Sequence, residues 1–374
     1  MNPSIVINPI LASGGDHGYL YGLFFLILAL IIGAAANHFL HKVPLPFTVV
    51  LMLIGLGLGF AHREGLFGVG GHAGSGHGAG HEGFLSKLLD ALRGSIEWGA
   101  NLDPHLILYV FLPILIFEAA YALDVHVFKK SFWNAFYMAG PGIVSATVMT
   151  GGCIVAIYSL GWGLTEWNVS TGNLGLYLAM LFGAVVSATD PVAVVALLKE
   201  LGASKKLGTL IEGESLLNDG TAIVAFLLLI GAVTGLGVFT AFGAVKGFFY
   251  IGLGGAALGI VIGLVGVAWV KRVFNDPLVE TSVMLMTAYL TFYVCEHIFV
   301  MSGVLGLVAL GLVWAGIGRT RISPEVQHFM HEFWEFAAFV ANVIIFIVVG
   351  VVIALKVEAQ LVDFLVLGLV YLTI

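Results

Sequence analysis

Two neighbouring apolar segments of the chain contain carboxylates, which are costly inside a membrane. The first segment, residues 174–198, has Thr189-Asp190-Pro191 near its middle. The second segment, residues 207–235, has Glu-Gly-Glu-Ser-Leu-Leu-Asn-Asp at 212–219. Each is long enough to cross a bilayer, which takes roughly 20 residues. Ionisable side chains at such depth generally face a cavity or a partner, so the two segments predict a buried polar site.

Pro191 is expected to interrupt the helix that carries it. It has no N–H, and its ring clashes with the carbonyl four residues back, which belongs to Ser187. It also pushes Asp190 away from α geometry. The freed backbone groups must then line a protein-walled or wet cavity. A carboxylate at such a break is typical of cation sites in secondary transporters. The alternative is a structural kink in which Asp190 caps the second half-helix.

The second segment places its polar side chains on two adjoining helix faces. Glu212, Ser215 and Asp219 are three and four residues apart and share one face, and Glu214 and Asn218 form an i,i+4 pair on the next. A carboxylate in a partly dry cavity is harder to ionise than one in water, which brings exchange of a proton for a cation close to neutral pH. Oxygen ligands suit hard ions such as Na⁺. The residues predicted to supply them are Asp219, Asp190, Ser215 and Thr189, with the opened backbone.

The composition indicates a polytopic membrane protein. Of the 374 residues, 60% are hydrophobic and only 10% are charged, against about 25% charged residues in soluble domains. The N-terminus lacks the features of a cleaved signal peptide, so the first apolar run is expected to be an uncleaved anchor. Cys153 and Cys295 both lie in apolar segments and indicate neither a disulfide nor a metal site.

Apolar runs predict about eleven spans, and the distribution of basic residues predicts their orientation. The spans are 18–40, 44–61, 104–123, 132–161, 174–198, 207–235, 240–270, 279–299, 301–318, 334–355 and 361–374. The odd-numbered connections hold ten Lys and Arg and the even-numbered ones hold four, which places the odd connections in the cytoplasm and the N-terminus outside. Because the last run stops at Ile374, the protein is expected to continue beyond it.

The second connection, residues 62–103, is the only long one. Its first part, with His72, His77 and His81 among Gly, Ala and Ser, is expected to be a flexible extracellular loop; a metal or pH sensor is the alternative. Its second part, from Phe84 to Trp98, is amphipathic and is expected to form a helix on the membrane surface.

The two motifs carry a resemblance to a known family. Ser-Ala-Thr-Asp-Pro-Val-Ala-Val-Val at 187–195, followed by Glu-Gly-Glu-Ser-Leu-Leu-Asn-Asp-Gly at 212–220, resembles the Na⁺/H⁺ exchangers of the monovalent cation:proton antiporter family. The intervening residues 198–207 are most similar to the plasma-membrane salt-tolerance exchangers of plants, with the sperm-type exchangers next. The similarity covers most of the chain from about residue 100 onward, and paired motifs at this spacing are highly specific.

The resemblance implies an all-α, inverted-repeat antiporter fold with broken crossing helices. Thirteen spans are expected, about eleven of them within residues 1–374, with the helices of a dimer domain and of a mobile core interleaved in sequence. It implies alternating access by movement of that core, a homodimer in the plasma membrane surrounded by lipid, and roles in pH homeostasis and salt tolerance. It implies no cofactor and no nucleic-acid partner. A cytoplasmic regulatory tail would lie outside this chain.

The resemblance also assigns roles to individual residues. Asp219 is the carboxylate that binds Na⁺ or H⁺ in turn, and Thr189 and Asp190 contribute to or support the site. Asn218, counted among the ion-binding residues, stands where electrogenic relatives carry a second aspartate, which implies exchange of one Na⁺ (or Li⁺) for one H⁺ without net charge movement. Glu214 is expected to pair with an arginine of the eleventh helix, beyond residue 374.

Three other functions are alternatives to this one. An intramembrane aspartyl protease would use Asp190 and Asp219 as a dyad that shares a proton, but the residues around Asp219 are Asn-Asp-Gly rather than Gly-x-Gly-Asp. A cation channel would favour rings of like charge or repeated filter carbonyls, which are not visible. A K⁺-accepting cation/proton antiporter remains open, because the residues do not distinguish Na⁺ from Li⁺ or K⁺.

Overall fold

The structure is a computed structural model, and its described part is helical. It describes residues 18–39, 45–66, 84–159, 173–188, 204–234, 241–273, 276–322 and 324–357, with a few single positions between 194 and 202. No strand occurs among these residues. Eight of the described helices are long and apolar enough to cross a membrane. The prediction of an all-α polytopic membrane protein is therefore confirmed.

The described helices follow most of the predicted spans, with two corrections. The span predicted to start at 132 begins at Val125, because the side chain of Asp124 accepts hydrogen bonds from the N–H groups of His126 and Val127 and caps the helix there. The span predicted to start at 334 belongs to a helix that begins at Pro324 and runs unbroken to Lys356. At about 1.5 Å per residue its 33 residues measure about 50 Å, more than the hydrocarbon core of about 30 Å.

Other predictions are tested only in part. The spans 44–61 and 174–198 correspond to shorter apolar helices at Phe47–Arg63 and Gly175–Val186. The amphipathic segment after the long loop is a helix, Phe84–Ala100. The span 361–374 and the three loop histidines at 72, 77 and 81 lie outside the described residues.

The helices form two compact units. The first unit contains α1 (Gly18–Phe39), α2 (Phe47–Arg63), α3 (Phe84–Ala100), α4 (Pro104–Val110) and the part of α14 (Pro324–Lys356) from Phe339 onward. Its core is apolar, with Leu51, Ile96, Val343 and Val351 fully buried. Glycines allow close approach within this unit, as where Gly22 of α1 lies against the Trp98 ring of α3.

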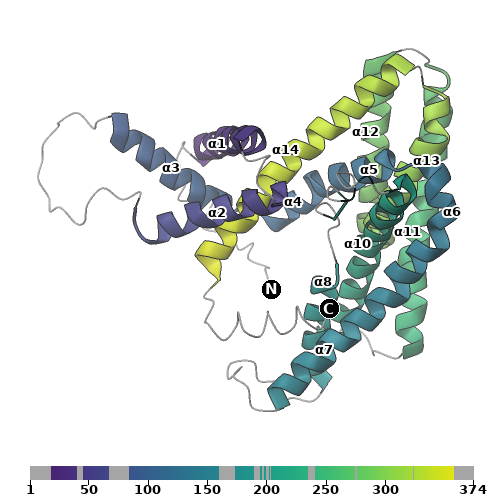
Figure 1. Ribbon diagram of the computed structural model, residues 1–374, viewed down its shortest axis with the longest axis horizontal. Helices are drawn as coiled ribbons and strands as arrows, with labels where there is room; N and C mark the ends of the chain where they lie inside the picture. The colour runs from purple at the N-terminus through teal and green to yellow at the C-terminus, as the bar shows by residue number, and fades with distance from the viewer. Residues whose placement is uncertain are drawn as a thin grey trace, which may run out of the picture. The chain divides into compact units, whose positions relative to one another are not determined.

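The second unit contains the remaining described helices and the first part of α14 (Figure 1). They are α5 (Leu112–Ala122), α6 (Val125–Tyr137), η2 (Met138–Gly142), α7 (Ile143–Ser159), α8 (Asn173–Val186), α10 (Lys205–Val233), α11 (Ala241–Val270), α12 (Pro277–Tyr293), η3 (Val294–Phe299), α13 (Gly303–Gly316) and η4 (Gly318–Thr320). Buried aromatic rings dominate its core; Phe117 of α5 packs on Trp334 of α14 with ring centroids 4.5 Å apart. This unit holds the predicted site.

Small residues set the distance between α11 and α13 in the second unit. Gly255 and Gly259 lie four residues apart on α11 and rest on the backbone of Ser302 and Gly306. A methyl group added at Gly259 would lie 2.8 Å from the carbonyl carbon of Gly306. This contact is the close backbone approach that small residues permit between membrane helices.

Candidate functional site

Helix α10 carries the central carboxylate of the predicted site. Ser204 caps its N-terminus by accepting a hydrogen bond from the N–H of Leu207. Asp219 is the fifteenth of the 29 residues counted from Lys205, so it lies about 20 Å from either end of the helix. Its side chain is partly buried. Asp219 thus lies near the middle of a helix that is long and apolar enough to cross a membrane.

Asn218 connects α10 to the end of α8. Its side chain is only 4% exposed, and its amide nitrogen donates to the carbonyl oxygen of Ser187 at 3.4 Å. In a continuous helix that carbonyl would accept from residue 191, which is a proline and has no N–H. Asn218 therefore supplies a donor to a carbonyl that Pro191 cannot satisfy. A buried carbonyl left without a donor is unfavourable, so this contact stabilises the end of α8.

Helix α8 ends at Val186, five residues before Pro191. Ser187 forms a turn, and its hydroxyl donates to the carbonyl of Gly183 at 2.6 Å. Thr189, Asp190 and Pro191 lie outside the described residues. The helix break at Pro191, and the approach of Asp190 to Asp219, therefore stay predictions.

Thr221 connects α10 to a π-turn that interrupts another helix. The π-turn η2, with Pro141 inside it, joins α6 to α7, and the three segments follow one another along one line (Figure 1). The N–H of Ile143, which would donate to Ala139 in a regular α-helix, donates to Gly140. The hydroxyl of Thr221 donates to the carbonyl of Ala139 at 2.8 Å. Thr221 was not among the predicted site residues.

Two glycines face the other neighbours of α10. A methyl group on Gly213 would overlap the Phe128 ring of α6, and one on Gly220 would overlap Leu305 of α13. α10 thus packs closely on α6 at Gly213 and on α13 at Gly220. Ser215, which is 4% exposed, shares a face with Asp219 that is distinct from the glycine face.

The structure therefore groups part of the predicted set. Asn218, Asp219, Ser215 and Glu214 lie within two turns of α10 in the second unit. Glu214 is partly buried and, among the residues that the structure describes, forms no ion pair. Its expected arginine partner stays a prediction.

One further carboxylate of the second unit, Glu296, has a structural role, and one pocket of the first unit offers no cation ligands. The carboxylate of Glu296 accepts a hydrogen bond from the N–H of Gly303 at 2.8 Å and so caps the start of α13 together with Ser302.

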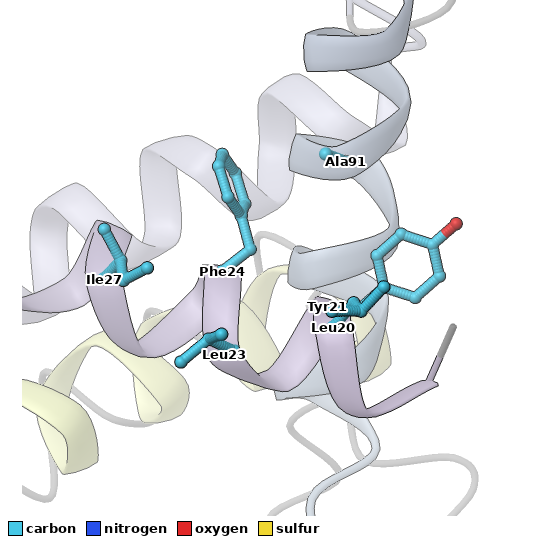
Figure 2. Close-up of a pocket in the computed structure, with 6 residues that line it drawn as sticks. All are labelled: Leu20, Tyr21, Leu23, Phe24, Ile27 and Ala91. Atoms are coloured by element: carbon cyan, nitrogen blue, oxygen red, sulfur yellow. The ribbon is translucent and has the colours of Figure 1, made fainter. Parts of the chain in front are cut away.

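A pocket between α1 and α3 in the first unit is lined by apolar side chains, and the Tyr21 hydroxyl is the one polar group among them (Figure 2). This pocket lacks the oxygen ligands that a hard cation requires.

The sequence was compared with known proteins. The family model described as "Sodium/hydrogen exchanger, transmembrane" matches residues 26–374. Sodium/hydrogen exchanger 7 of Arabidopsis thaliana is 37% identical over 332 residues, which is 89% of this chain and 26% of that protein. The antiporter ApNhaP of Aphanothece halophytica is 33% identical over 332 residues, or 87% of this chain and 54% of its own length. The low-affinity antiporter NhaS1 of Synechocystis is 40% identical over 251 residues, which is 67% of this chain and 45% of that protein. The chain thus spans between about a quarter and about half of the length of these relatives.

Proposed function

The chain belongs to the transmembrane sodium/hydrogen exchanger family, and on that premise we propose that it exchanges Na⁺ for H⁺ across a membrane without moving net charge. The relatives at 33–40% identity are named as Na⁺/H⁺ exchangers or antiporters. The observation that carries the proposal is the partly buried carboxylate of Asp219 at the middle of α10. Its neighbour Asn218 donates to the carbonyl of Ser187, four residues before Pro191.

Asp219 is the group that Na⁺ and H⁺ occupy in turn. A single carboxylate that is either protonated or bound to a cation couples the two ions, because one must leave before the other binds. Thr189, Asp190 and backbone oxygens at the predicted break complete the ligand set, with Ser215 on the same face of α10 as Asp219. These ligands suit Na⁺ or Li⁺ by their hardness. Glu214 supports the site through the expected arginine.

Exchange requires the site to face each side of the membrane in turn. We propose alternating access in which a core that includes α10 moves against a dimer domain, in a homodimer of the plasma membrane with the N-terminus outside. Helices interrupted near their middle favour this mechanism, since the opened backbone binds the ion while the surrounding helices move as rigid bodies.

A reconstitution experiment tests the proposed function. The full-length protein in proteoliposomes should move protons when an opposing Na⁺ gradient is imposed, and clamping the membrane potential at zero should not slow this movement. A channel would instead produce a current, and an aspartyl protease would show no coupling of the two ions. Proton movement that depends on K⁺ but not on Na⁺ would favour the K⁺-accepting antiporter.

Replacing Asn218 by aspartate is expected to shift exchange toward net charge movement. The variant adds a second titratable group beside Asp219 and removes the amide that donates to Ser187. We expect more than one H⁺ per Na⁺, measured as a transport rate that becomes sensitive to the membrane potential. We also expect a loss of stability of about 1–3 kcal/mol, because a buried carbonyl loses its donor.

Asn218→Ala is the matched control for this prediction. It also removes the donor to Ser187 but adds no titratable group, so stability should fall while exchange stays electroneutral. If exchange by Asn218→Asp is also indifferent to the membrane potential, the proposed link between this position and stoichiometry is wrong.

A further inference from the structure

Helix α10 is bonded through its side chains to two other helices, each close to a proline. Asn218 donates to Ser187, four residues before Pro191, and Thr221 donates to Ala139, two residues before Pro141. The bond from Thr221 is the shorter one, at 2.8 Å against 3.4 Å. The Thr221 hydroxyl also lies 3.0 Å from the carbonyl oxygen of Asn218 in its own helix. Both side chains are almost fully buried.

These two hydrogen bonds restrict the rotation of α10 about its axis. Asn218 and Thr221 are three residues apart and lie about 60° from each other around the helix, so they form one anchoring face. Asp219 lies about 100° from Asn218, off that face. A side chain reaches about 5–6 Å from a helix axis, so a rotation of about 20° would move its end by about 2 Å. Binding sites tolerate displacements of only about 0.5 Å.

The π-turn explains why the acceptor is available. Pro141 has no N–H, and the N–H of Ile143 donates to Gly140, three residues back, instead of to Ala139, four residues back. Ala139 is 1% exposed, so its carbonyl oxygen has little access to water, and it accepts from Thr221. The residues in contact are 82 positions apart in sequence. The bond therefore fixes α10 against a distant segment rather than stabilising a local turn.

We propose that Thr221 is a positioning residue for Asp219: its hydrogen bond to Ala139 in the π-turn sets the rotation of α10 and, through it, the affinity of the exchanger for Na⁺. This rests on the proposed function, because it assigns Na⁺ binding to Asp219. The glycine contacts of α10 permit close packing but contain no directional bond. The two donors on the anchoring face add directional bonds to the neighbouring segments.

The test is the apparent KM for Na⁺ of the reconstituted full-length protein. Thr221→Val keeps the shape of the side chain and removes its donor, and it should raise KM about fivefold, or about 1 kcal/mol at 1.4 kcal/mol per tenfold change. The maximal rate should stay within about twofold. Thr221→Ser keeps the hydroxyl and should restore the original KM. Thr221→Cys, whose thiol is a weak donor, should give a KM between those of the valine and serine variants. It replaces the valine variant in the test if that variant does not fold.

Thr291→Val is the matched control. Thr291 is fully buried in α12 of the same unit, but its hydroxyl donates to Thr287 in its own helix. Its removal should leave KM unchanged. Equal effects of Thr221→Val and Thr291→Val, or a loss of folded protein without a change in KM, would overturn the positioning role. If the unaltered protein exchanges no Na⁺, the proposed function fails and this inference fails with it; if it exchanges normally and Thr221→Val does too, only this inference fails.

A second arm tests the acceptor side. Pro141→Ala returns an N–H to the π-turn and allows a regular helix, in which Ile143 donates to Ala139. In that background Thr221→Val should change KM much less than fivefold, because the carbonyl has a donor within its own helix. Additive effects of the two substitutions would contradict a direct link between Thr221 and the turn.

Discussion

Replacing Asp219 by asparagine is expected to reduce Na⁺-driven proton movement to the level of protein-free vesicles. The amide has nearly the same shape as the carboxyl group, but it takes up no proton and carries no charge to balance Na⁺. Competition between the two ions for one group is then lost. Because the substitution removes a partly buried charge without changing the side-chain volume, the protein should stay folded.

The measurement is the change of internal pH in proteoliposomes after a pulse of external Na⁺. Asp276→Asn is the matched control: Asp276 is an exposed aspartate of the same unit that caps α12 by accepting the N–H groups of Leu278 and Val279. Asparagine caps helices about as well as aspartate, so exchange by this variant should equal that of the unaltered protein. Exchange at the normal rate by Asp219→Asn would refute the role of Asp219.

Hydropathy accounts for most of what the sequence predicted about this fold. A run of apolar residues must form a helix in lipid because its backbone groups have no other partners. The predicted spans therefore fall mainly on helices where the structure describes their residues. The boundaries that were wrong lie where the helix continues into polar sequence: Lys129 and Lys130 lie inside α6, and His328 and Glu332 lie inside α14. Hydropathy marks only the part of a helix that lipid surrounds.

Hydrogen bonds between residues that are far apart in the sequence were harder to predict than the helices. The bond from Asn218 to Ser187 follows from a local rule, since Pro191 deprives that carbonyl of its donor, but the rule does not say which distant side chain replaces it. The bond from Thr221 to Ala139 depends on the π-turn at Met138–Gly142, and the sequence of that turn does not say which distant side chain donates to it. A threonine three residues after Asn218, on the same face, was the available signal.

The contact between α11 and α13 gives the prediction with the largest expected effect on folding. Replacing Gly259 by leucine is expected to prevent the second unit from packing, because even a methyl group there would lie 2.8 Å from the carbonyl carbon of Gly306. The neighbour in contact is backbone, which cannot rotate aside as a side chain can. Gly259→Ala should be the milder form and should lower stability by about 1–3 kcal/mol, as is usual for overpacking.

Gly231 provides the comparison that separates this clash from the general effect of losing a glycine. It lies near the end of α10 in the same unit and has open space where a side chain would begin. Gly231→Ala should stabilise the protein by up to about 1 kcal/mol, because alanine favours the helix. Thermal unfolding of the purified variants in detergent is measured by the loss of the monodisperse peak. The unfolding temperature should be highest for Gly231→Ala, intermediate for the unaltered protein and lowest for Gly259→Ala. If the two alanine variants unfold at the same temperature, α11 and α13 are not held together by backbone contact at Gly259. The second unit would then have to tolerate a larger distance between α11 and α13. That distance also affects α10, because Leu305 of α13 rests on Gly220 of α10.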